Sequence, residues 1–352
     1  MVQLRAFRKT MTVLAVALGV AVALSLLPGN VYQRWQLLDG TIHANARWIY
    51  ERCRFDPTPI DVAFIGPSRT AAGVNAPRLG EALAQRGLPS NVVNFSLPET
   101  GRNINLSIAQ ELFMYKKPKL LVLGVIEKPS RFGHSGFKYI ADRNLIINPG
   151  YIADFDYFSD LIYLPFRQAR LFVADLLPSG LGLRKTFEPG HYRGSTIDTT
   201  GSIVLPDGKV KDGENPASAA ELLRGVKKLE AGEHPPLLPD PWADLEFGDE
   251  RHNVAKIAEL ARSHGAQVAF LFLPYFTGPH TLTEQKFYDR YGPTLNAGFL
   301  SPHAEWFADY GHLTRQGARI LTDWLVEPIG ALLRSGTAAG QRDREGLGPT
   351  KS

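Results

Sequence analysis

An uncharged apolar segment near the N-terminus constrains this chain more than any other feature. Residues 11–27 carry no charged side chain, follow Arg5, Arg8 and Lys9, and precede Pro28. At about 1.5 Å per helical residue the segment reaches about 25 Å, which suits a short membrane-spanning helix and also the apolar part of a signal peptide. Because neither an A-x-A cleavage site nor a lipobox cysteine follows, we favour an uncleaved single-pass anchor.

The basic residues ahead of this segment predict its orientation. By the positive-inside rule the N-terminus stays in the cytoplasm, and the chain after about residue 30 lies on the periplasmic (extracytoplasmic) side of the inner membrane. The only cysteine, Cys53, cannot form an internal disulfide, so an exported body must be stabilised by its core. A net charge of +4 without a dense Lys/Arg cluster indicates no nucleic-acid partner.

Short apolar segments rich in branched side chains alternate with amphipathic helical segments after residue 58. This alternation predicts a three-layer α/β/α domain built on a parallel sheet. The predicted strands are 60–66, 91–97, 119–126 and 266–274, and the predicted helices include 75–87, a segment around 104–112, 254–261 and 315–334.

We divide the chain into four parts. Residues 1–30 form a cytoplasmic tip and the transmembrane anchor, 31–57 a helical stalk, 58–335 the α/β domain, and 336–352 a polar, disordered tail. Within the domain, residues 184–245 are rich in Gly, Pro, Asp and Lys, with weak periodicity. This composition predicts an insertion that is partly loop.

Three strand exits carry residues that suit acyl-transfer chemistry. Ser68 follows the first strand, Gly101 follows the second and precedes a helix, and Asp309 and His312 precede the last helix. Because ligands of open parallel sheets bind beyond the carboxyl ends of the strands, these residues are expected to meet there. An Asp three residues ahead of a His can hold its Nδ1–H and leave Nε2 to take a proton from a serine. Taken singly, each motif also fits an ordinary turn or helix cap.

In this order the motifs resemble those of the SGNH (GDSL-like) hydrolase and acyltransferase superfamily, which has a flavodoxin-like parallel sheet. The resemblance implies that Ser68 is the nucleophile, His312 the base and Asp309 its orienter. It also implies an oxyanion hole formed by the backbone N–H groups of Ser68 and Gly101. Pro67 stands where the family has Asp.

The third block of the family, G-x-N-D, is missing, since residues 124–128 read G-V-I-E-K. Loss of that Asn removes one donor from the oxyanion hole, a change worth about 10²–10³ in rate where such a donor acts. We therefore consider Asn103 and Asn105 as auxiliary donors. In this respect, and in its anchor, the chain looks most like the periplasmic polysaccharide O-acetyltransferases of the alginate type and the D-alanyl-transfer proteins.

The resemblance implies a membrane-anchored serine O-acyltransferase that forms an acyl-enzyme, needs no cofactor and acetylates a cell-surface polysaccharide or exopolysaccharide. A membrane-embedded acyltransferase would supply the acyl group. Alternatives are an anchored carbohydrate or lipid esterase, and a non-catalytic scaffold of a glycan-modifying complex. Arg69 is expected either to bind an anionic substrate or to pair with a carboxylate.

Thr100 and Tyr275 are further candidate substrate-binding residues. Together with Tyr192 and Trp242, Tyr275 would either stack on a sugar or pack in the core. The eight histidines other than His312 show no metal-binding spacing, and no nucleotide-binding motif is present, so neither a metal nor a nucleotide is expected.

Overall fold

A computed structural model of the protein describes the backbone of residues 2–152, 154–177, 180–204, 209–232 and 236–345. Its centre is a five-stranded sheet with the order β2-β1-β3-β6-β7, in which every pair of neighbours is parallel. The predicted α/β class is confirmed, and the sheet order is that of a doubly wound domain. The strands are β1 (Val62–Ile65), β2 (Val92–Asn94), β3 (Leu120–Val125), β6 (Gln267–Phe272) and β7 (Thr294–Asn296).

Each of the first four strands lies inside a predicted segment, whereas β7 was not predicted. It has three residues, of which only Leu295 is buried, so it carries neither the length nor the apolar pattern of a strand. It forms because Phe270, Leu271 and Phe272 of β6 offer it a paired edge. A strand this short depends on its neighbour more than on its own sequence.

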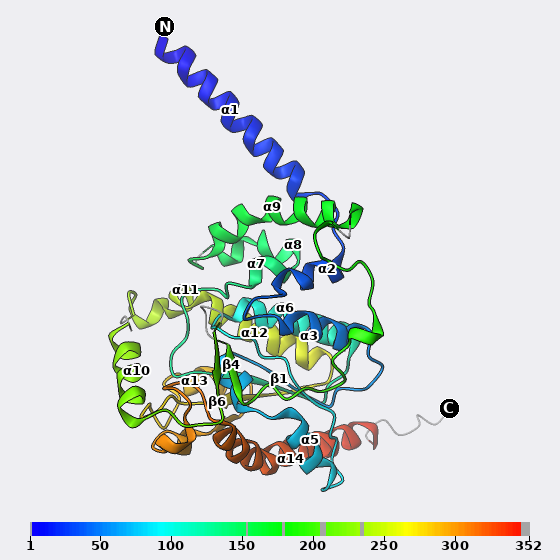
Figure 1. Ribbon diagram of the computed structural model, residues 1–352, viewed down its shortest axis with the longest axis vertical. Helices are drawn as coiled ribbons and strands as arrows, with labels where there is room; N and C mark the ends of the chain where they lie inside the picture. Colours follow the sequence, from blue (N-terminus) through cyan, green and yellow to red (C-terminus); the bar gives the residue numbers. More distant parts are fainter. Residues whose placement is uncertain (1, 153, 178–179, 205–208, 233–235, 346–352) are drawn as a thin grey trace.

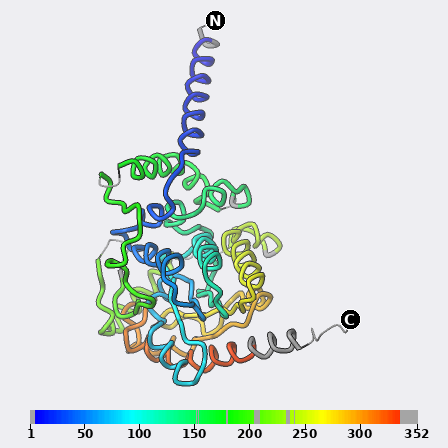
Figure 2. The backbone as a smooth tube through the Cα atoms, turned by 90° about the vertical axis from the view of Figure 1, so that its right-hand side faces the viewer, coloured from blue at the N-terminus to red at the C-terminus, as the bar shows by residue number. Residues whose placement is uncertain are grey.

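Helices cover both faces of the sheet (Figures 1 and 2). Alternate residues of β3 point to opposite faces: Leu121 and Leu123 join one hydrophobic cluster, and Leu120 and Val122 the other. Helices α3 (Asn45–Arg54), α6 (Arg102–Tyr115) and α12 (Gly248–Ser263) contribute to the first cluster, and α5 (Ala76–Ala84), α10 (Ala219–Ala231) and α14 (Arg315–Glu345) to the second.

Helix α1 (Val2–Ser25) projects from one end of the body (Figure 1). Its residues Arg5–Ser25 form a helix long and apolar enough to cross a membrane, and none of that length is buried against the rest of the protein. The structure thus agrees with the sequence that the chain begins with a helix suited to a single membrane span.

The expected stalk over residues 31–57 is wrong. This segment forms α2 (Val31–Trp35), the 3-10 turn η1 (Gln36–Leu38) and α3, and it packs into the domain. Trp35, Trp48 and Cys53 are each only 1% exposed and belong to the main hydrophobic cluster. The segment therefore completes one helical layer and is not a spacer.

The middle of the chain contains α4 (Ser68–Gly73), α7 (Phe137–Ile140), α8 (Arg143–Ile146), η2 (Pro149–Tyr151) and α9 (Tyr157–Leu176). The expected insertion holds mostly short elements: η4 (Pro189–His191), β4 (Ser202–Val204), β5 (Val210–Asp212), α10, η5 (Asp240–Trp242) and α11 (Ala243–Glu246). Strands β4 and β5 form a separate antiparallel pair. Helix α10 was missed, although Ser218 and Glu221 form a capping box that marks its start.

The final part of the chain contains α13 (Gln285–Tyr288), η6 (Gly298–Leu300), η7 (Ala304–Trp306) and α14. Helix α14 begins at Arg315 as predicted, but it continues to Glu345, so the expected disorder from residue 336 is wrong up to that point. The rest of the predicted tail, 346–352, lies outside the described residues.

Candidate active site

Ser68 stands at the carboxyl edge of the sheet, shortly after the end of β1. It is the first residue of α4, and Pro67 and Gly66 separate it from the end of β1. A side chain at Gly66 would put its Cβ 2.6 Å from Thr70 Oγ1 and 2.9 Å from Gly124 Cα of β3. Glycine is needed at position 66 because β3 and the first turn of α4 approach the backbone so closely.

His312 and Asp309 complete a hydrogen-bonded chain with Ser68. His312 Nε2 lies 2.8 Å from Ser68 Oγ, and His312 Nδ1 lies 2.9 Å from both carboxylate oxygens of Asp309. Asp309 Oδ1 also accepts the backbone N–H groups of Gly311 (2.8 Å) and His312 (2.9 Å). The structure therefore brings the three predicted catalytic residues together in the order that nucleophilic catalysis requires.

Local backbone pairing holds the Asp309–His312 turn in place. Ala308 N–H donates to the carbonyl of His312 (2.9 Å), and Phe307 pairs with Leu313 in an isolated bridge. Burial acts to raise the pKa of Asp309, but its hydrogen bond to His312, the charge of His312 and the two backbone donors outweigh burial. The pKa of Asp309 lies below its usual value as a result, which keeps a negative charge behind the imidazole.

Gly101 lies directly ahead of α6, with φ 126° and ψ 124°. Within the described residues, no protein group accepts the backbone N–H of Gly101 or of Ser68. The two N–H groups that the SGNH resemblance assigns to an oxyanion hole are thus free of protein acceptors, and their joint role stays a prediction.

The side-chain oxygens of the two asparagines considered as auxiliary donors accept hydrogen bonds around the start of α6, and the donor role of their amide nitrogens stays a prediction. Asn103 is 1% exposed, and its side-chain oxygen accepts the backbone N–H groups of Ile104 (2.8 Å) and His134 (2.9 Å). Asn105 Oδ1 accepts from Arg102 at 2.9 Å. Asn103 ties the start of α6 to the loop at residues 133–134, and Asn105 lines the pocket beside Gly101.

Asp249 is a residue that sequence reasoning missed. From the second residue of α12, its carboxylate accepts the backbone N–H groups of Arg102 (2.5 Å) and Asn103 (2.9 Å), which are the first two of α6. Burial raises the pKa of Asp249 well above its usual value. Because Asp249 occupies these two donors, the N–H of Gly101 is the one left at this helix start. No local pattern marks Asp249, since it lies 147 residues after Arg102.

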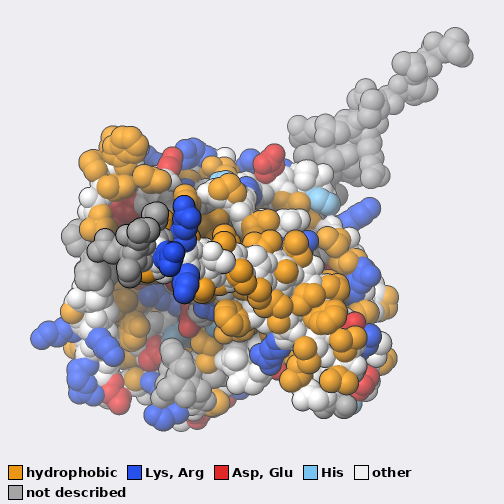
Figure 3. All heavy atoms as spheres, turned by 90° about the horizontal axis from the view of Figure 1, so that it is seen from above, with side chains coloured by type: hydrophobic (Ala, Val, Ile, Leu, Met, Phe, Trp, Pro, Cys, Tyr) orange, Lys and Arg blue, Asp and Glu red, His pale blue; other side chains and the backbone are white. Residues whose placement is uncertain are grey.

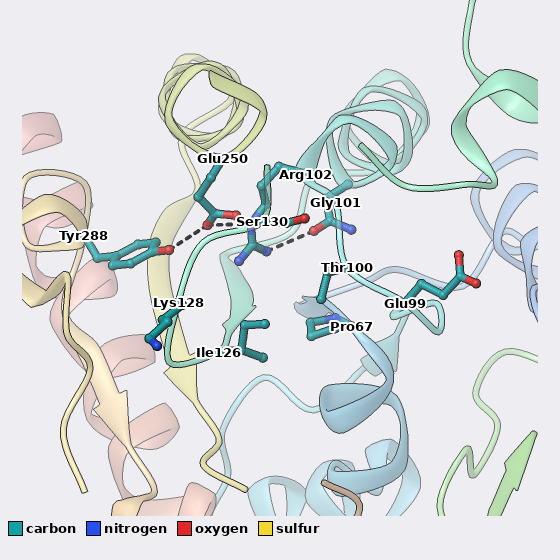
Figure 4. A pocket seen from close by; sticks show the side chains of 11 residues that line it. Pro67, Glu99, Thr100, Gly101, Arg102, Ile126, Lys128, Ser130, Glu250 and Tyr288 are labelled. Carbon is teal, nitrogen blue, oxygen red and sulfur yellow. Dashed lines mark hydrogen bonds and ion pairs between the residues drawn. The ribbon is translucent and has the colours of Figure 1, made fainter. Parts of the chain in front are cut away.

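A polar pocket opens beside the catalytic edge (Figure 4). A buried network forms one wall, in which Glu250 binds Arg102 Nε (2.9 Å) and the hydroxyl of Tyr288 (2.7 Å). Thr100, a predicted substrate-binding residue, is exposed and lines the pocket. The remaining lining residues are Pro67, Glu99, Gly101, Asn105, Ile126, Lys128 and Ser130.

Arg69 pairs with a carboxylate, the second of its two expected roles. Its NH1 lies 2.5 Å and its NH2 3.2 Å from the carboxylate of Glu127, and NH1 also donates to the carbonyl of Leu273 (3.2 Å). The side chains of Arg69 and Glu127 are 11% and 6% exposed. Glu127, which follows β3, therefore forms a largely buried ion pair with Arg69.

The three aromatic residues considered as a sugar platform differ in their contacts and in their exposure. Tyr275 is 7% exposed within a hydrophobic cluster, and its hydroxyl lies 3.3 Å from Glu230 of α10. The hydroxyl of Tyr192 donates to Asp56 (2.6 Å), and Trp242 is 59% exposed. For Tyr275 and Tyr192 these contacts match core packing, the second of the two expectations.

Three residues distant in sequence meet near the pocket: His43, Glu99 and His134 offer ligand atoms within 4.8 Å of one another. Sequence spacing alone did not reveal this group. Burial lowers the pKa of His134 to about 3, so its imidazole is neutral. Its Nδ1 accepts from Gly136 N–H (3.0 Å) and its Nε2–H donates to the carbonyl of Pro98 (2.5 Å). Both nitrogens of His134 are in use, so the group acts as a polar link between loops and not as a preformed metal centre.

The fold and the site define the class of this protein: a doubly wound α/β domain with a Ser–His–Asp chain at the carboxyl edge of its sheet, joined to a helix of membrane-spanning length. No protein-family model and no curated protein matches the chain.

Proposed function

We propose that the protein is a membrane-anchored serine acyltransferase of the SGNH type, with its α/β domain on the periplasmic side of the inner membrane. One observation carries the proposal: Ser68 Oγ, the imidazole of His312 and the carboxylate of Asp309 are joined by hydrogen bonds of 2.8 and 2.9 Å at the carboxyl edge of the sheet. Serine alone is a weak nucleophile at neutral pH, and this arrangement is the one that activates it.

In the first half of the reaction His312 Nε2 takes the proton of Ser68 Oγ as the oxygen attacks the carbonyl carbon of an acyl ester or thioester. The negative charge that develops on the carbonyl oxygen is stabilised by the N–H groups of Ser68 and Gly101. Asp309 stabilises the imidazolium and holds its orientation. When the intermediate collapses, the bond to the leaving group breaks, and His312 returns the proton to that group.

In the second half a hydroxyl of the acceptor attacks the acyl-enzyme, and His312 takes its proton and then returns a proton to Ser68. A sugar hydroxyl as acceptor gives transfer, and water gives hydrolysis. The membrane-length helix and the resemblance to polysaccharide O-acetyltransferases support transfer to a polysaccharide, with a membrane-embedded acyltransferase as donor. An anchored carbohydrate or lipid esterase would use the same acyl-enzyme.

The missing third-block Asn fits this proposal because two backbone donors remain. Where the G-x-N-D motif has its Asn, this chain has Ile126, and Glu127 at the next position holds Arg69 at the edge of the site. We expect the loss to lower the rate by about 10²–10³ relative to a site with all three donors, and not to abolish catalysis.

Labelling the full-length protein with a fluorophosphonate tests whether Ser68 is an activated nucleophile. We expect an adduct on Ser68 that disappears in Ser68→Ala and falls by at least about 10³-fold in rate in His312→Ala. Ser263→Ala is the matched control, because Ser263 is exposed and bonds only the end of its own helix. A folded protein without an adduct would exclude both the transferase and the esterase and leave the non-catalytic scaffold.

Acetyl release from a chromogenic ester then separates the two enzymatic functions. If the protein is a transferase, oligosaccharide acceptors accelerate release and become acetylated. If release is the same in water alone and no sugar product forms, the protein is an esterase.

A further inference from the structure

Helix α9 is apolar on two sides. Its inward side packs against the body through Leu164, Leu171 and Ala174, each 1% exposed or less. Its outward side carries a second apolar stripe at helical spacing, formed by Phe158, Ile162, Phe166, Val173 and Leu176. A helix that is apolar all round is ordinarily buried, either in a protein core or in a membrane.

The outward stripe is unusually exposed for large apolar side chains. Phe158 is 59% exposed, Ile162 67%, Phe166 66% and Leu176 63%. The only other exposed positions of the helix are Ser159 and Arg170. A contiguous patch of this kind marks a surface that meets another apolar phase or a partner.

Direct contacts join α9 to the end of α1. Gln168 Nε2 donates to the carbonyl of Leu27 (2.8 Å), immediately after the apolar helix. Gly29 lies so close to α9 that a Cβ there would be 2.9 Å from the Cβ of Leu171. No long spacer separates the two helices, and α9 lies at the base of α1 (Figure 1).

The charges beside the stripe suit a membrane surface. Among the acidic residues of α9, Asp160 is buried, and Asp175 forms an ion pair with Lys185 at 3.1 Å. Arg170 is exposed on the same helix, and Arg143 of the preceding helix α8 reaches the carbonyl of Ser25 at 3.3 Å. Figure 3 views this end of the molecule with α1 projecting toward the viewer, and hydrophobic side chains cover much of the face that it shows.

We propose that the outward stripe of α9 inserts into the extracytoplasmic leaflet of the bilayer that α1 spans, and so docks the catalytic domain on the membrane surface. The inference rests on the membrane-spanning role proposed for α1. Given that role, the structure favours the bilayer as the phase that covers the stripe, because α9 contacts the chain where the apolar segment of α1 ends. Interfacial helices bury an apolar face at the headgroup boundary in this way.

Single-cysteine labelling of the full-length chain tests the proposal. Cys53 is 1% exposed, so an environment-sensitive fluorophore attached through a thiol reports the introduced site. The probe is placed in Phe166→Cys on the stripe, in Val16→Cys on α1, and in Leu223→Cys on α10. All three positions are more than half exposed in the protein. Each variant is reconstituted into vesicles of phosphatidylethanolamine and phosphatidylglycerol with and without lipids that carry a quencher in the acyl chain.

We expect quenching by the lipid-bound quencher at positions 16 and 166, at least about three-fold stronger than at position 223. Quenching at 16 without quenching at 166 overturns the docking of α9 and leaves the anchor intact. No quenching at either position overturns both. If the fluorophore at position 166 is exposed to water in pure lipid vesicles but shielded in native membranes, a protein partner covers the stripe. This outcome also overturns the proposal. Because the readout needs no acyl transfer, its failure is distinct from failure of the proposed enzymatic activity.

Discussion

Gly101 offers the sharpest test of how the oxyanion site is built, and the informative change is Gly101→Ala. The backbone at this position has φ 126°, a conformation that L side chains rarely adopt. An added Cβ would also stand 2.6 Å from the carbonyl carbon of Gly133 and 2.6 Å from the Cα of His134. These are backbone atoms, so they cannot rotate away as the end of a side chain would.

The expected cost has two parts. The strained φ alone costs about 1–3 kcal/mol. Relief of the collision must move either the 133–134 loop or the N–H of Gly101, and loss of an oxyanion donor lowers the rate by about 10²–10³-fold. We therefore expect Gly101→Ala to remain folded, with a lowered melting temperature and a rate of acyl-enzyme formation reduced by at least 10²-fold.

Gly87→Ala separates the two parts. Gly87 has φ 67° at the end of α5, and a Cβ there would meet nothing within 4 Å. Gly87→Ala therefore carries a penalty for an L residue at positive φ, without the steric collision and without any contact to the site. Thermal unfolding and fluorophosphonate labelling rates of both variants are compared with those of the parent protein. If Gly101→Ala labels as fast as Gly87→Ala, the N–H of Gly101 is not an oxyanion donor and the reasoning is refuted.

Three further changes test the site and its surroundings. Asp309→Asn should lower the labelling rate by about 10³–10⁴-fold with little change in melting temperature, because an amide holds the wrong tautomer of the triad histidine; an unchanged rate would contradict the orienting role. Glu127→Gln should lower the free energy of unfolding by about 3 kcal/mol, since it leaves the largely buried guanidinium of Arg69 without its anion. Asp323→Asn is the control at an exposed ion pair, and thermal unfolding should show a cost of less than about 1 kcal/mol there. Burial raises the pKa of Glu111 to about 7 from an ordinary 4.5. Between pH 4.5 and pH 7 the folded chain therefore keeps a proton that the unfolded chain has lost. The free energy of unfolding falls by up to about 3 kcal/mol as the pH rises through this range. Glu111→Gln should remove that loss, seen as a gain in melting temperature over the parent protein at pH 8 that is absent at pH 5; an equal gain at both would refute the shifted pKa.

The residues that could be placed from the sequence are those whose position follows from a local rule. Ser68 and Gly101 each follow a buried strand, and His312 precedes a helix with Asp309 three residues before it. The carboxyl ends of parallel strands meet at one edge, so these local positions were enough to predict a shared site. The observed distances between Ser68, His312 and Asp309 agree with that expectation.

Contacts between distant segments could not be placed in this way. Asp249 binds the start of α6 from 146 and 147 residues away, and Arg69 meets Glu127 across 58 residues. Neither carboxylate stands in a motif, because a buried acid needs only a donor at the right place in space. His43 and His134 likewise lie 91 residues apart, which no metal-binding spacing rule covers.

The wrong prediction of a stalk has a physical cause. Residues 31–57 mix polar and aromatic side chains, a composition that fits both an exposed spacer and a helix with one buried face. The structure buries Trp35 and Trp48 but also Arg52, whose guanidinium donates to the carbonyls of Ser195 (2.6 Å), Thr58 (2.7 Å) and Pro59 (2.7 Å). Its Nε also lies 3.7 Å from the carboxylate of Asp56. A polar residue with its partners supplied inside the fold can enter a core, so polarity alone did not indicate exposure.

Burial of this segment changes what the anchor does. A stalk would let the α/β domain move away from the membrane that α1 is proposed to span, whereas Asn30, which caps α2, and Gln168, which holds Leu27, join the end of α1 directly to the body. With α1 in the bilayer, Ser68 is then held at a fixed height above the membrane, and rotation of the domain is limited by α9. Under the proposed function, the acyl donor and the acceptor would both have to reach the serine at that height. A donor embedded in the same membrane meets this condition without a diffusing carrier, whereas a polysaccharide must approach along the membrane surface.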